Sequence, residues 1–281
     1  MGIVLHWHEE VLNAFSGFGL LVNLKPDGLH WILDFDEGHD LGGSRLAVDL
    51  VSVSAAPEPA ALVALQERYA ADGCQLVHLW EDIWKSRQAQ VMGRIAALLG
   101  LNKRIHGRQT VVARVSQAVA DDFLSRHHLQ GAVRTRYRLA LLFGAEVMAL
   151  ACFSNLRLMK GHAGEYRSAE LARFANRTGY TVTGGFSKLL NAFIAEFRPD
   201  DVMSYADRDW SAGGVYLRAG FVLKARTPPA RIWLDPLSLE RFFPHRIPGP
   251  VADDGRGYDL LPVFNTGNLK YVLYLKGAAV V

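Results

Sequence analysis

Apolar residues recur at three- and four-residue steps through residues 189–197, and this spacing predicts an amphipathic helix. A strand-like run ending near residue 174 comes before it, and a turn rich in Thr and Gly at residues 181–185 leads into it. A second strand at residues 202–205 and a short helix at residues 211–219 follow. Polar groups therefore collect where strands end and helices begin, which is where open α/β sheets bind their ligands.

The remainder of the second half of the chain shows the same alternation of strands and helices. Ser116 is placed to cap a helix that runs to about residue 126, and Gly144 lies in a hairpin turn. Strands are predicted before the helix, on both sides of the hairpin turn and near the end of the chain, at residues 110–115, 138–143, 147–154, 222–226, 231–234 and 269–275. Residues 236–262, rich in Pro, Gly and charge, read as a long loop.

The first half of the chain has a similar but shorter pattern. Strands are predicted at residues 29–35, 45–53 and 74–80, with one helix at residues 58–71 and another beginning near residue 84. Residues 100–104 form a basic linker. Residues 1–30 carry no pattern with a chemical meaning, and His6 and His8 are expected to be exposed to solvent.

The alternation of strands and helices predicts the α/β (α+β) class, and composition supports a folded protein. The chain has 281 residues, half of them hydrophobic, which is enough to bury a sizeable core. Apolar runs do not approach the 18 residues or so of a membrane span, and a cytoplasmic location is expected. The two cysteines, Cys74 and Cys152, lie in apolar surroundings and are predicted to be buried thiols.

Charge is distributed unevenly along the chain. Residues 1–84 have a net charge of −10, whereas residues 85–138 have a net charge of +9, mostly from arginine. Such a segment is typical of surfaces that neutralise DNA phosphates, although a solvated basic face is the alternative. The candidate DNA-binding side chains are Arg104, Arg108, Arg134, Arg136 and Arg138.

The turn before the amphipathic helix is a candidate anion site. Gly184 and Gly185 would let the backbone approach a phosphate at the helix N-terminus, and Ser187 and Lys188 would add a hydroxyl and a charge. Arg173 would clamp a carboxylate or phosphate. The alternatives are a tight strand-to-helix turn and an ion pair of Arg173 with Glu165 or Glu170.

Candidate catalytic groups follow the second strand and the capped helix. Asp207 is the first candidate for a general base, and its alternative is a helix cap or an ion pair with Arg208. His127 or His128 would act as an acid or base or bind a metal, and the alternative is a capping or core histidine. Tyr205 and Tyr216 offer a hydroxyl or a stacking face, and both are also typical core residues.

Five sequence segments together resemble a GNAT-like (acetyltransferase-fold) domain of bacteriophage proteins, which include the Mom-like DNA-modification proteins. The segments are HHLQG, LARF, GGFSKLL, SYADRDWSAGGVY and NTGNLKY, and the resemblance covers roughly residues 107–281. It implies a mixed-sheet transferase domain, DNA as partner and the exocyclic amine of a flipped base as target. An acyl-CoA-type donor is one option, but the usual R-x-x-G-x-G loop is missing.

The strand, turn, strand, helix, strand order of residues 1–106, ending in HLWEDIW, resembles the Vsr-like branch of the PD-(D/E)xK nucleases. Matching positions would make Asp34 or Asp36, Asp49 and Glu81 the ligands of Mg²⁺. The family's lysine has no counterpart between Lys25 and Lys85. We therefore expect a degenerate nuclease-like domain at 1–106.

These observations predict a two-domain, phage-type protein: a nuclease-like lobe and, at 107–281, a GNAT-like transferase domain that modifies a DNA base. Two alternatives stay open at this point. One is a Mg²⁺-dependent endonuclease that uses the acidic residues of the first lobe, and the other is a non-catalytic DNA-binding or virion-associated protein.

Overall fold

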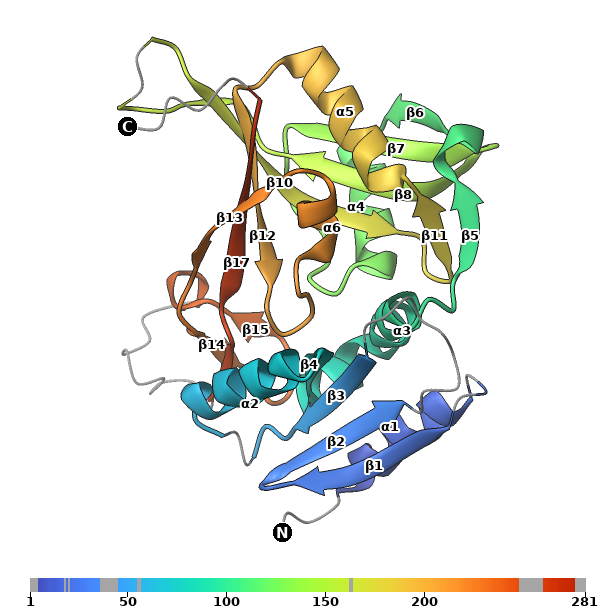
Figure 1. Ribbon diagram of the computed structural model, residues 1–281, viewed down its shortest axis with the longest axis vertical. Coiled ribbons are helices and arrows are strands. Elements are labelled where there is room, and N and C mark those ends of the chain that lie inside the picture. The colour runs from blue at the N-terminus through green and yellow to red at the C-terminus, as the bar shows by residue number, and fades with distance from the viewer. Residues whose placement is uncertain are drawn as a thin grey trace. The chain divides into compact units, whose positions relative to one another are not determined.

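The computed structural model describes residues 5–17, 19, 21–35, 45–54, 57–161, 164–247 and 260–275 (Figure 1). The chain is of the α/β class and forms two compact units. Unit 1 comprises Met1–Val91, Asp207–Ala212 and Arg226–Asn268, and unit 2 comprises Met92–Ala206, Gly213–Ala225 and Leu269–Val281. Within the described residues, no helix is both long and apolar enough to cross a membrane.

Unit 1 is built on a four-stranded sheet in the order β1-β2-β3-β4, with β3 and β4 parallel and the other neighbours antiparallel. Its elements are α1 (His6–Ser16), β1 (Val22–Asp27), β2 (His30–Phe35), β3 (Arg45–Val51), α2 (Pro59–Ala71), β4 (Cys74–Trp80) and the start of α3 (Glu81–Leu98). Strands β3 and β4 are buried along almost their whole length. This explains why their sequences are nearly continuous apolar runs rather than alternating ones.

A second, three-stranded sheet of unit 1 comes from the C-terminal half of the chain. It has the order β15-β14-β16 and consists of β14 (Ala230–Leu234), β15 (Arg241–Phe242) and β16 (Leu261–Asn265), with the short helix η2 (Pro244–Arg246) after β15. Its apolar residues share one buried cluster with the N-terminal part, formed by Val51, Leu62, Trp80, Ile232, Leu234, Val263 and Phe264. Arg241 also binds the buried carboxylate of Asp82 through two hydrogen bonds of 2.6 and 2.8 Å.

Unit 1 therefore departs from the domain limits 1–106 and 107–281 that the sequence suggested. The chain returns to unit 1 because the apolar face at Trp80 is covered by Phe264 and its neighbours, which no local pattern reveals. Helix α1 and strand β1 were not predicted. His8 was expected to be exposed but is buried inside α1, whereas His6 is exposed.

Unit 2 contains a long mixed sheet in the order β13-β17-β12-β10-β8-β7-β6, with β9 beside β10 (Figure 1). The strands are β6 (Val111–Arg114), β7 (Tyr137–Phe143), β8 (Glu146–Phe153), β9 (Arg157–Leu158), β10 (Arg167–Asn176), β12 (Asp201–Asp207), β13 (Val222–Arg226) and β17 (Asn268–Tyr274). The helices are η1 (Gly107–Gln109), α4 (Gln117–His127), α5 (Gly185–Phe197) and α6 (Gly214–Arg218). The order strand, helix, hairpin, strand, helix, strand, helix, strand predicted for this half is confirmed.

Two of the short strands of unit 2 that were missed pair with each other. β5 (Lys103–His106) lies where a basic linker was predicted, and it pairs in parallel with β11 (Tyr180–Thr183). A strand of four residues is too short to show the alternation of apolar and polar residues that marks strands, and its partner strand is far away in the sequence. The predicted cap at Ser116 is confirmed, because its hydroxyl accepts the N–H of Val119.

Helix α5 holds the core of unit 2. Phe186, Leu189, Leu190 and Phe193 are buried, and the ring of Phe193 stacks on that of Phe153 at 3.9 Å. Each fully buried side chain of this size contributes about 1.5–3 kcal/mol to stability. The three- and four-residue spacing seen in the sequence is therefore the face of α5 that packs into the core.

Strands β10 and β12 pair in parallel over only a short stretch. The described ladder joins Ser168–Asp201, Ala169–Val202 and Glu170–Met203, and then ends. Strand β10 continues beside β8, but its register shifts between Leu171 and Arg173. We call the point at which β10 and β12 stop pairing the fork.

The chain returns to unit 2 at Gly213, which is closely packed against Tyr271. Gly213 has φ of +78°, and a Cβ atom there would lie 1.9 Å from the hydroxyl oxygen of Tyr271. We expect Gly213→Ala to lower the free energy of unfolding of unit 2 by about 2–3 kcal/mol, from overpacking and backbone strain together. Chemical denaturation measures this change.

Gly144→Ala is the matched control for this prediction. Gly144 also has a positive φ, +61°, but a Cβ atom there would meet nothing within 4 Å. Only the backbone strain of about 1–2 kcal/mol remains. Equal losses of stability in the two variants would contradict the steric role of Tyr271.

Candidate functional site

Two hydroxyl groups meet at the fork of unit 2. The Oγ of Ser204, on β12, donates to the carbonyl of Leu171, on β10, at 2.8 Å, one step beyond the last paired residues. The hydroxyl of Tyr216, on α6, lies 3.0 Å from the same Oγ. The Oγ of Ser204 thus donates toward two acceptors, the carbonyl oxygen of Leu171 and the hydroxyl oxygen of Tyr216, which share its single proton.

The ring of Tyr216 is held on three sides by other aromatic rings. It stacks on Tyr271 at 5.0 Å, with 12° between the planes, and it meets Phe186 and Phe221 edge to face at 5.6 and 5.5 Å. Rings in these arrangements contribute beyond the area that they bury. The hydroxyl of Tyr216 is therefore fixed at the fork by a rigid apolar support.

Burial raises the pKa of the Tyr216 hydroxyl, although the bond with Ser204 and the positive charges of Arg94 and Arg173 oppose this effect. Tyr216 thus stays protonated near neutral pH and serves as a hydrogen-bond donor. Arg94 lies in the part of α3 that belongs to unit 2, and Arg173 lies at the register shift of β10, where its Nη1 donates to the carbonyl of Ala172 at 2.7 Å.

The N-terminus of α5 has part of the geometry that the sequence suggested for an anion site. Gly184 is its N-cap residue with φ of 76°, the N-cap position gives no side-chain hydrogen bond, and Ser187 is exposed in the first turn. Lys188 points elsewhere: its Nζ donates to the carbonyls of Gly107 and Thr110, at 2.8 and 2.5 Å. The role predicted for Lys188 in holding a donor therefore has no support in this geometry.

The two histidines at the end of α4 each accept a hydrogen bond from a backbone N–H group. The Nδ1 of His127 accepts the N–H of Thr178 at 3.3 Å, and the Nδ1 of His128 accepts that of Gln130 at 3.1 Å. A backbone N–H only donates, so each neutral ring carries its proton on Nε2. Burial and the charges of Arg126 and Arg177 lower the pKa of His127. This geometry matches the capping alternative better than an acid or base.

Asp207 and Tyr205 take ordinary structural positions. An oxygen of the Asp207 carboxylate accepts the N–H of Asp209 at 3.1 Å, which closes a turn after β12. The next helix, α6, begins only at Gly214, so this bond is not the helix cap that was the alternative. Tyr205 is 41% exposed, and the ammonium group of Lys270 lies 6.0 Å from the centre of its ring. A catalytic role of either residue stays a prediction.

Four of the five candidate DNA-binding arginines are on the surface of unit 2. They are Arg104, Arg108, Arg134 and Arg136. Arg138 is partly buried instead, and its guanidinium donates to the carbonyls of Val115 and Thr135 and to the side chain of Gln117. Arg138 therefore supports the fold around the N-terminus of α4.

The acidic residues matched to a Mg²⁺ site lie in unit 1 and have other partners. Asp34 pairs with Lys25 at 2.5 Å, and Glu81 pairs with Lys85 at 2.6 Å and accepts from Ser52 at 3.1 Å. Asp36 lies outside the described residues. Among those that are described, no group of three His, Cys, Asp or Glu side chains is arranged to hold a metal ion. The residues therefore do not fit the Mg²⁺ site that the resemblance implied.

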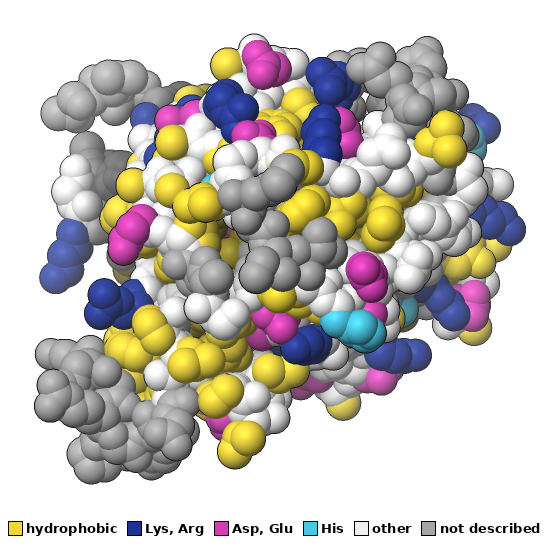
Figure 2. All heavy atoms as spheres, turned by 90° about the horizontal axis from the view of Figure 1, so that it is seen from below, with side chains coloured by type: hydrophobic (Ala, Val, Ile, Leu, Met, Phe, Trp, Pro, Cys, Tyr) yellow, Lys and Arg dark blue, Asp and Glu magenta, His cyan; other side chains and the backbone are white. Residues whose placement is uncertain are grey.

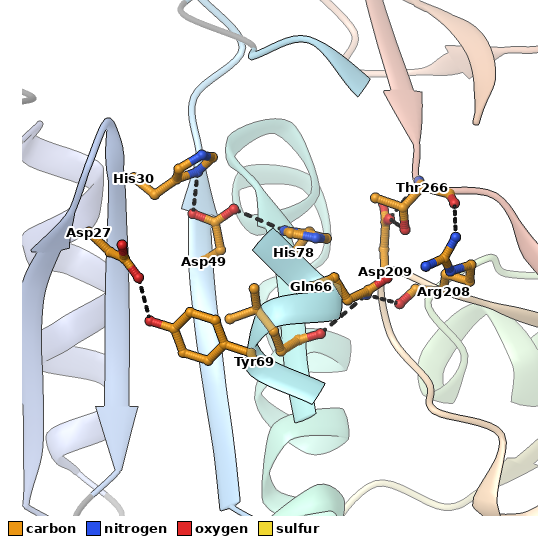
Figure 3. Close-up of polar contacts among 10 residues, drawn as sticks. Asp27, His30, Asp49, Gln66, Tyr69, His78, Arg208, Asp209 and Thr266 are labelled. Atoms are coloured by element: carbon orange, nitrogen blue, oxygen red, sulfur yellow. Dashed lines mark hydrogen bonds and ion pairs between the residues drawn. The ribbon is translucent and has the colours of Figure 1, made fainter. Parts of the chain in front are cut away.

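Asp49 is instead the centre of a buried polar cluster (Figure 3). Its two oxygens lie 3.2 Å from the Nδ1 of His30 and 2.9 Å from the Nδ1 of His78, which are on the two neighbouring strands. Asp49 and His78 are fully buried. Burial alone would raise the pKa of Asp49, but the two histidine bonds outweigh it and lower that pKa.

The same close-up shows how unit 1 holds the segment 207–212 (Figure 3). The side chain of Gln66 donates to the carbonyl of Arg208 at 2.6 Å, and the buried carboxylate of Asp209 accepts the N–H and hydroxyl of Thr266 at 2.8 and 2.6 Å. Arg208 also pairs with Glu67 at 3.5 Å.

The acidic charge of unit 1 is partly balanced by such local pairs. Besides those already named, Arg68 pairs with Asp27 at 2.7 Å. On the face seen in Figure 2, Lys and Arg side chains lie among Asp and Glu side chains rather than apart from them.

Cys74 and Cys152 are buried free thiols, as predicted, and burial raises the pKa of Cys152 to about 11.

The residues that meet at the fork were only partly visible in the sequence. Tyr216 was one of two tyrosines considered, while Ser204 was not considered. A polar Ser204 in the otherwise apolar strand VMSYA was the one available signal, because buried polar side chains in strands bind a specific partner.

No family model matches the sequence, and no curated protein matches it. Solved structures of GNAT acetyltransferases do match. They include a GNAT family acetyltransferase of Elizabethkingia anophelis with acetyl-CoA bound (13% identity, TM-score 0.34), a ribosomal-protein-S5-alanine acetyltransferase of Vibrio fischeri (9%, 0.38) and a histone acetyltransferase HPA2 and related acetyltransferase of Corynebacterium glutamicum (15%, 0.35).

These matches cover 58–60% of this chain and 94–99% of the other chains. Their identities and TM-scores are low, so the substrates of those enzymes are not transferred to this chain. The chemistry has to be argued from its own residues.

Proposed function

We propose that this protein is a phage-type group transferase that modifies an exocyclic amine of a DNA base, with Tyr216 at its reacting centre. The observation that carries the proposal is the pair of hydroxyls at the fork. A protonated, partly buried tyrosine is held there by Ser204 and three aromatic rings. Groups fixed in this way are suited to give a proton to a leaving group.

The transfer itself requires few steps from the protein. The amine nitrogen attacks the electrophilic carbon of the donor, a C–N bond forms, and the bond to the leaving group breaks with its electron pair on that group. Tyr216 supplies a proton to the leaving group and recovers one from solvent. The amine gives its proton to a base, for which Asp207 stays the sequence candidate, and Asp207→Ala tests that role separately.

The first turn of α5 is suited to the anionic part of a donor. Gly184 removes the obstruction of a side chain at the cap, Ser187 is exposed beside it, and the helix dipole favours negative charge there. An activated acyl group on a phosphate-bearing carrier of the CoA type fits this chemistry, and it would supply the electrophilic carbon.

DNA as the acceptor is supported by the exposed arginines of unit 2. We expect the combined substitution of Arg104, Arg108, Arg134 and Arg136 by Gln to weaken DNA binding. Each arginine that contacts a phosphate should make the slope of log K against log salt less negative by about 0.9. Fluorescence anisotropy with a labelled duplex at several salt concentrations measures this.

Arg138→Gln is the control, because its guanidinium is engaged by the fold. It should leave the salt slope unchanged. A combined variant with the salt slope of the wild type would contradict a DNA-binding role for the four exposed arginines.

The test of the function is mass spectrometry of nucleosides from DNA of bacteria that express the chain. We expect a nucleoside of increased mass, which disappears in the Tyr216→Phe variant. Unmodified DNA in the presence of folded wild-type protein would contradict the proposal.

The endonuclease alternative is tested on the same preparation. Supercoiled plasmid incubated with the protein and Mg²⁺ should stay intact, because the acidic residues of unit 1 do not form a metal site. Nicking that stops with a chelator and with Asp49→Asn would favour the nuclease. Salt-sensitive DNA binding with neither activity would favour a binding protein.

A further inference from the structure

Two connections that carry the chain from unit 1 into unit 2 are bonded to each other. The first is the segment 207–212, between β12 and α6, and the second is the pair Thr266 and Gly267, between β16 and β17. Each connection leads to one of the two stacked tyrosines near the fork. Tyr216 follows the first connection along the chain, and Tyr271 follows the second.

Four hydrogen bonds join these connections within unit 1. The Oδ1 of Asp209 accepts both the N–H and the hydroxyl of Thr266, at 2.8 and 2.6 Å (Figure 3). The N–H of Arg208 donates to the carbonyl of Gly267 at 3.1 Å, and its guanidinium donates to the carbonyl of Thr266 at 3.3 Å. Asp209 is 2% exposed and Thr266 is fully buried, so water does not compete for these bonds. We call these four residues the clamp.

Two elements of unit 1 hold the clamp in place. The backbone N–H of His78, on β4, donates to the carbonyl of Asp209 at 3.0 Å, and Gln66, on α2, donates to the carbonyl of Arg208 at 2.6 Å. His78 is fully buried, and its ring is bound to the carboxylate of Asp49. The clamp is therefore fixed to the sheet and to a helix of unit 1.

Beyond the clamp, the two stretches of chain meet again inside unit 2. The rings of Tyr216 and Tyr271 stack with their centres 5.0 Å apart and 12° between their planes. A Cβ atom on Gly213 would lie 1.9 Å from the hydroxyl oxygen of Tyr271, so the backbone that enters α6 fits closely against this ring. Asp209 and Gly213 are only four positions apart in the sequence. A shift at the clamp is therefore passed to α6 with little chain to absorb it.

We propose that Asp209 and Thr266 are positioning residues for group transfer: their bond fixes the spacing of the two connections and so holds the hydroxyl of Tyr216 at the fork. The inference rests on the proposed function, because it concerns the reacting centre of that function. It gives unit 1 a structural part in the reaction. A displacement of about 1 Å at a reacting group can slow a reaction by about 10²-fold, so this spacing matters for the rate.

Hydrogen–deuterium exchange on the full chain tests the positioning without requiring catalysis. Thr266→Val removes the hydroxyl that donates to Asp209 but keeps the backbone N–H and nearly the same shape. The reporters are the amides of Tyr216, Leu217 and Phe221, which donate to carbonyls within and beside α6. We expect them to exchange about tenfold faster in this variant than in the wild type, because the connection to α6 opens more often.

The kinetics of transfer give a second measurement. In Thr266→Val, kcat for modification of a defined duplex should fall about 10- to 100-fold, while KM for the duplex stays within about twofold of the wild type. A loss of folded protein alone would not slow the exchange-competent, folded fraction in this way. Thr266→Ser keeps the hydroxyl and should restore both the exchange and the kcat of the wild type.

Tyr69→Phe is the matched control. It also removes a hydroxyl that donates to a carboxylate of unit 1, that of Asp27 at 2.9 Å, but neither residue belongs to the clamp. It should leave both the exchange of the α6 amides and kcat unchanged. Gln66→Leu releases the clamp from α2 and should speed exchange in the same direction as Thr266→Val, so the test does not depend on one variant.

The outcomes separate this inference from the function on which it rests. Equal exchange of the α6 amides in the wild type and in folded Thr266→Val and Gln66→Leu would overturn the inference. Faster exchange in both variants, in a protein that modifies no nucleoside, would support the hold of the clamp on α6 and reject the transferase. A nucleoside modified with equal kcat by the wild type and Thr266→Val would support the transferase and reject the positioning role.

Discussion

Replacement of Asp49 by alanine should lower the free energy of unfolding of unit 1 by about 3–5 kcal/mol. Asp49 is fully buried, and each of its oxygens receives one imidazole, from His30 and from His78. The substitution leaves both rings without their acceptor inside the sheet. His78 is itself fully buried, so water does not replace the lost partner without opening the structure.

Asp34→Ala is the matched control for this variant. Asp34 also lies on the sheet of unit 1, but its partner Lys25 is exposed, and pairs of this kind contribute about 0–1 kcal/mol. Urea denaturation followed by tryptophan fluorescence measures both variants, since Trp80 and Trp84 are buried in unit 1. A loss below about 1 kcal/mol for Asp49→Ala would contradict the structural role of the cluster.

The same cluster predicts how the stability of unit 1 depends on pH. The bond with Asp49 raises the pKa of His30 above its ordinary value of 6.5, against the opposing effect of burial. Stability from protonated His30 is therefore complete below pH 6.5 and is lost as the pH rises through the raised pKa. The lowered pKa of Asp49 gives stability that is complete above 3.8 and is lost as the pH falls through the lowered value.

Wild-type unit 1 should thus be most stable between about pH 4 and pH 6.5. Denaturation curves recorded from about pH 3 to pH 8 measure the effect on both sides of this range, and the Asp49→Ala variant should lose both slopes. A stability that stays flat from pH 5 to pH 8 in the wild type would show that His30 does not titrate against Asp49.

The second large effect is expected from Tyr216→Phe, which should slow group transfer by about 10²- to 10⁴-fold. The variant removes the proton donor but retains the ring that stacks on Tyr271. Stability should change by less than about 1 kcal/mol, because Ser204 keeps its bond to the carbonyl of Leu171. The measurement is the rate of formation of the modified nucleoside in a defined duplex.

Tyr137→Phe controls for the loss of a tyrosine hydroxyl in the same unit. Tyr137 packs its ring against Phe193 and Phe197 in the core and has no part in the proposed chemistry. The Tyr137→Phe variant should form the modified nucleoside at the wild-type rate. A Tyr216→Phe variant that is as active as the Tyr137→Phe variant would remove Tyr216 from the mechanism.

Local patterns predicted the elements of this fold well where the evidence for an element lies within it. The face of α5, the cap at Ser116 and the hairpin at Gly144 each have a complete local signal, and each is present. Helix α1 and strand β1 were missed because their apolar runs are short, and the glycines lie in the segment between the two elements and after β1. The short pair β5 and β11 depends on a partner about 75 residues away, as the pairing of Lys103 with Tyr180 shows.

The candidate sites were harder to predict than the elements, because they depend on register. Asp49 was matched, through the resemblance to nucleases, to a metal-binding carboxylate, but its actual partners follow from strand pairing. His78 lies directly opposite Asp49 in the parallel ladder of β3 and β4, and His30 comes from β2. The sequence suggested a metal ligand, and the pairing supplies two imidazoles instead.

The fork shows the same limit in unit 2. Where β10 and β12 stop pairing is a matter of a few residues, and the shift in β10 between Leu171 and Arg173 has no signal in the sequence. The convergence of Ser204 and Tyr216 could therefore not be read from spacing, although each lies within the segment that the sequence marked as central.

The late return of the chain to unit 1 has a consequence for biosynthesis. Trp80 leaves the ribosome long before Phe264, the residue whose ring meets it at 5.1 Å. At usual rates of translation this interval is roughly 10 to 40 seconds. During that time the nascent chain exposes the apolar side chains around Trp80 to solvent. We therefore expect chaperones that bind at the ribosomal exit tunnel to associate with this segment.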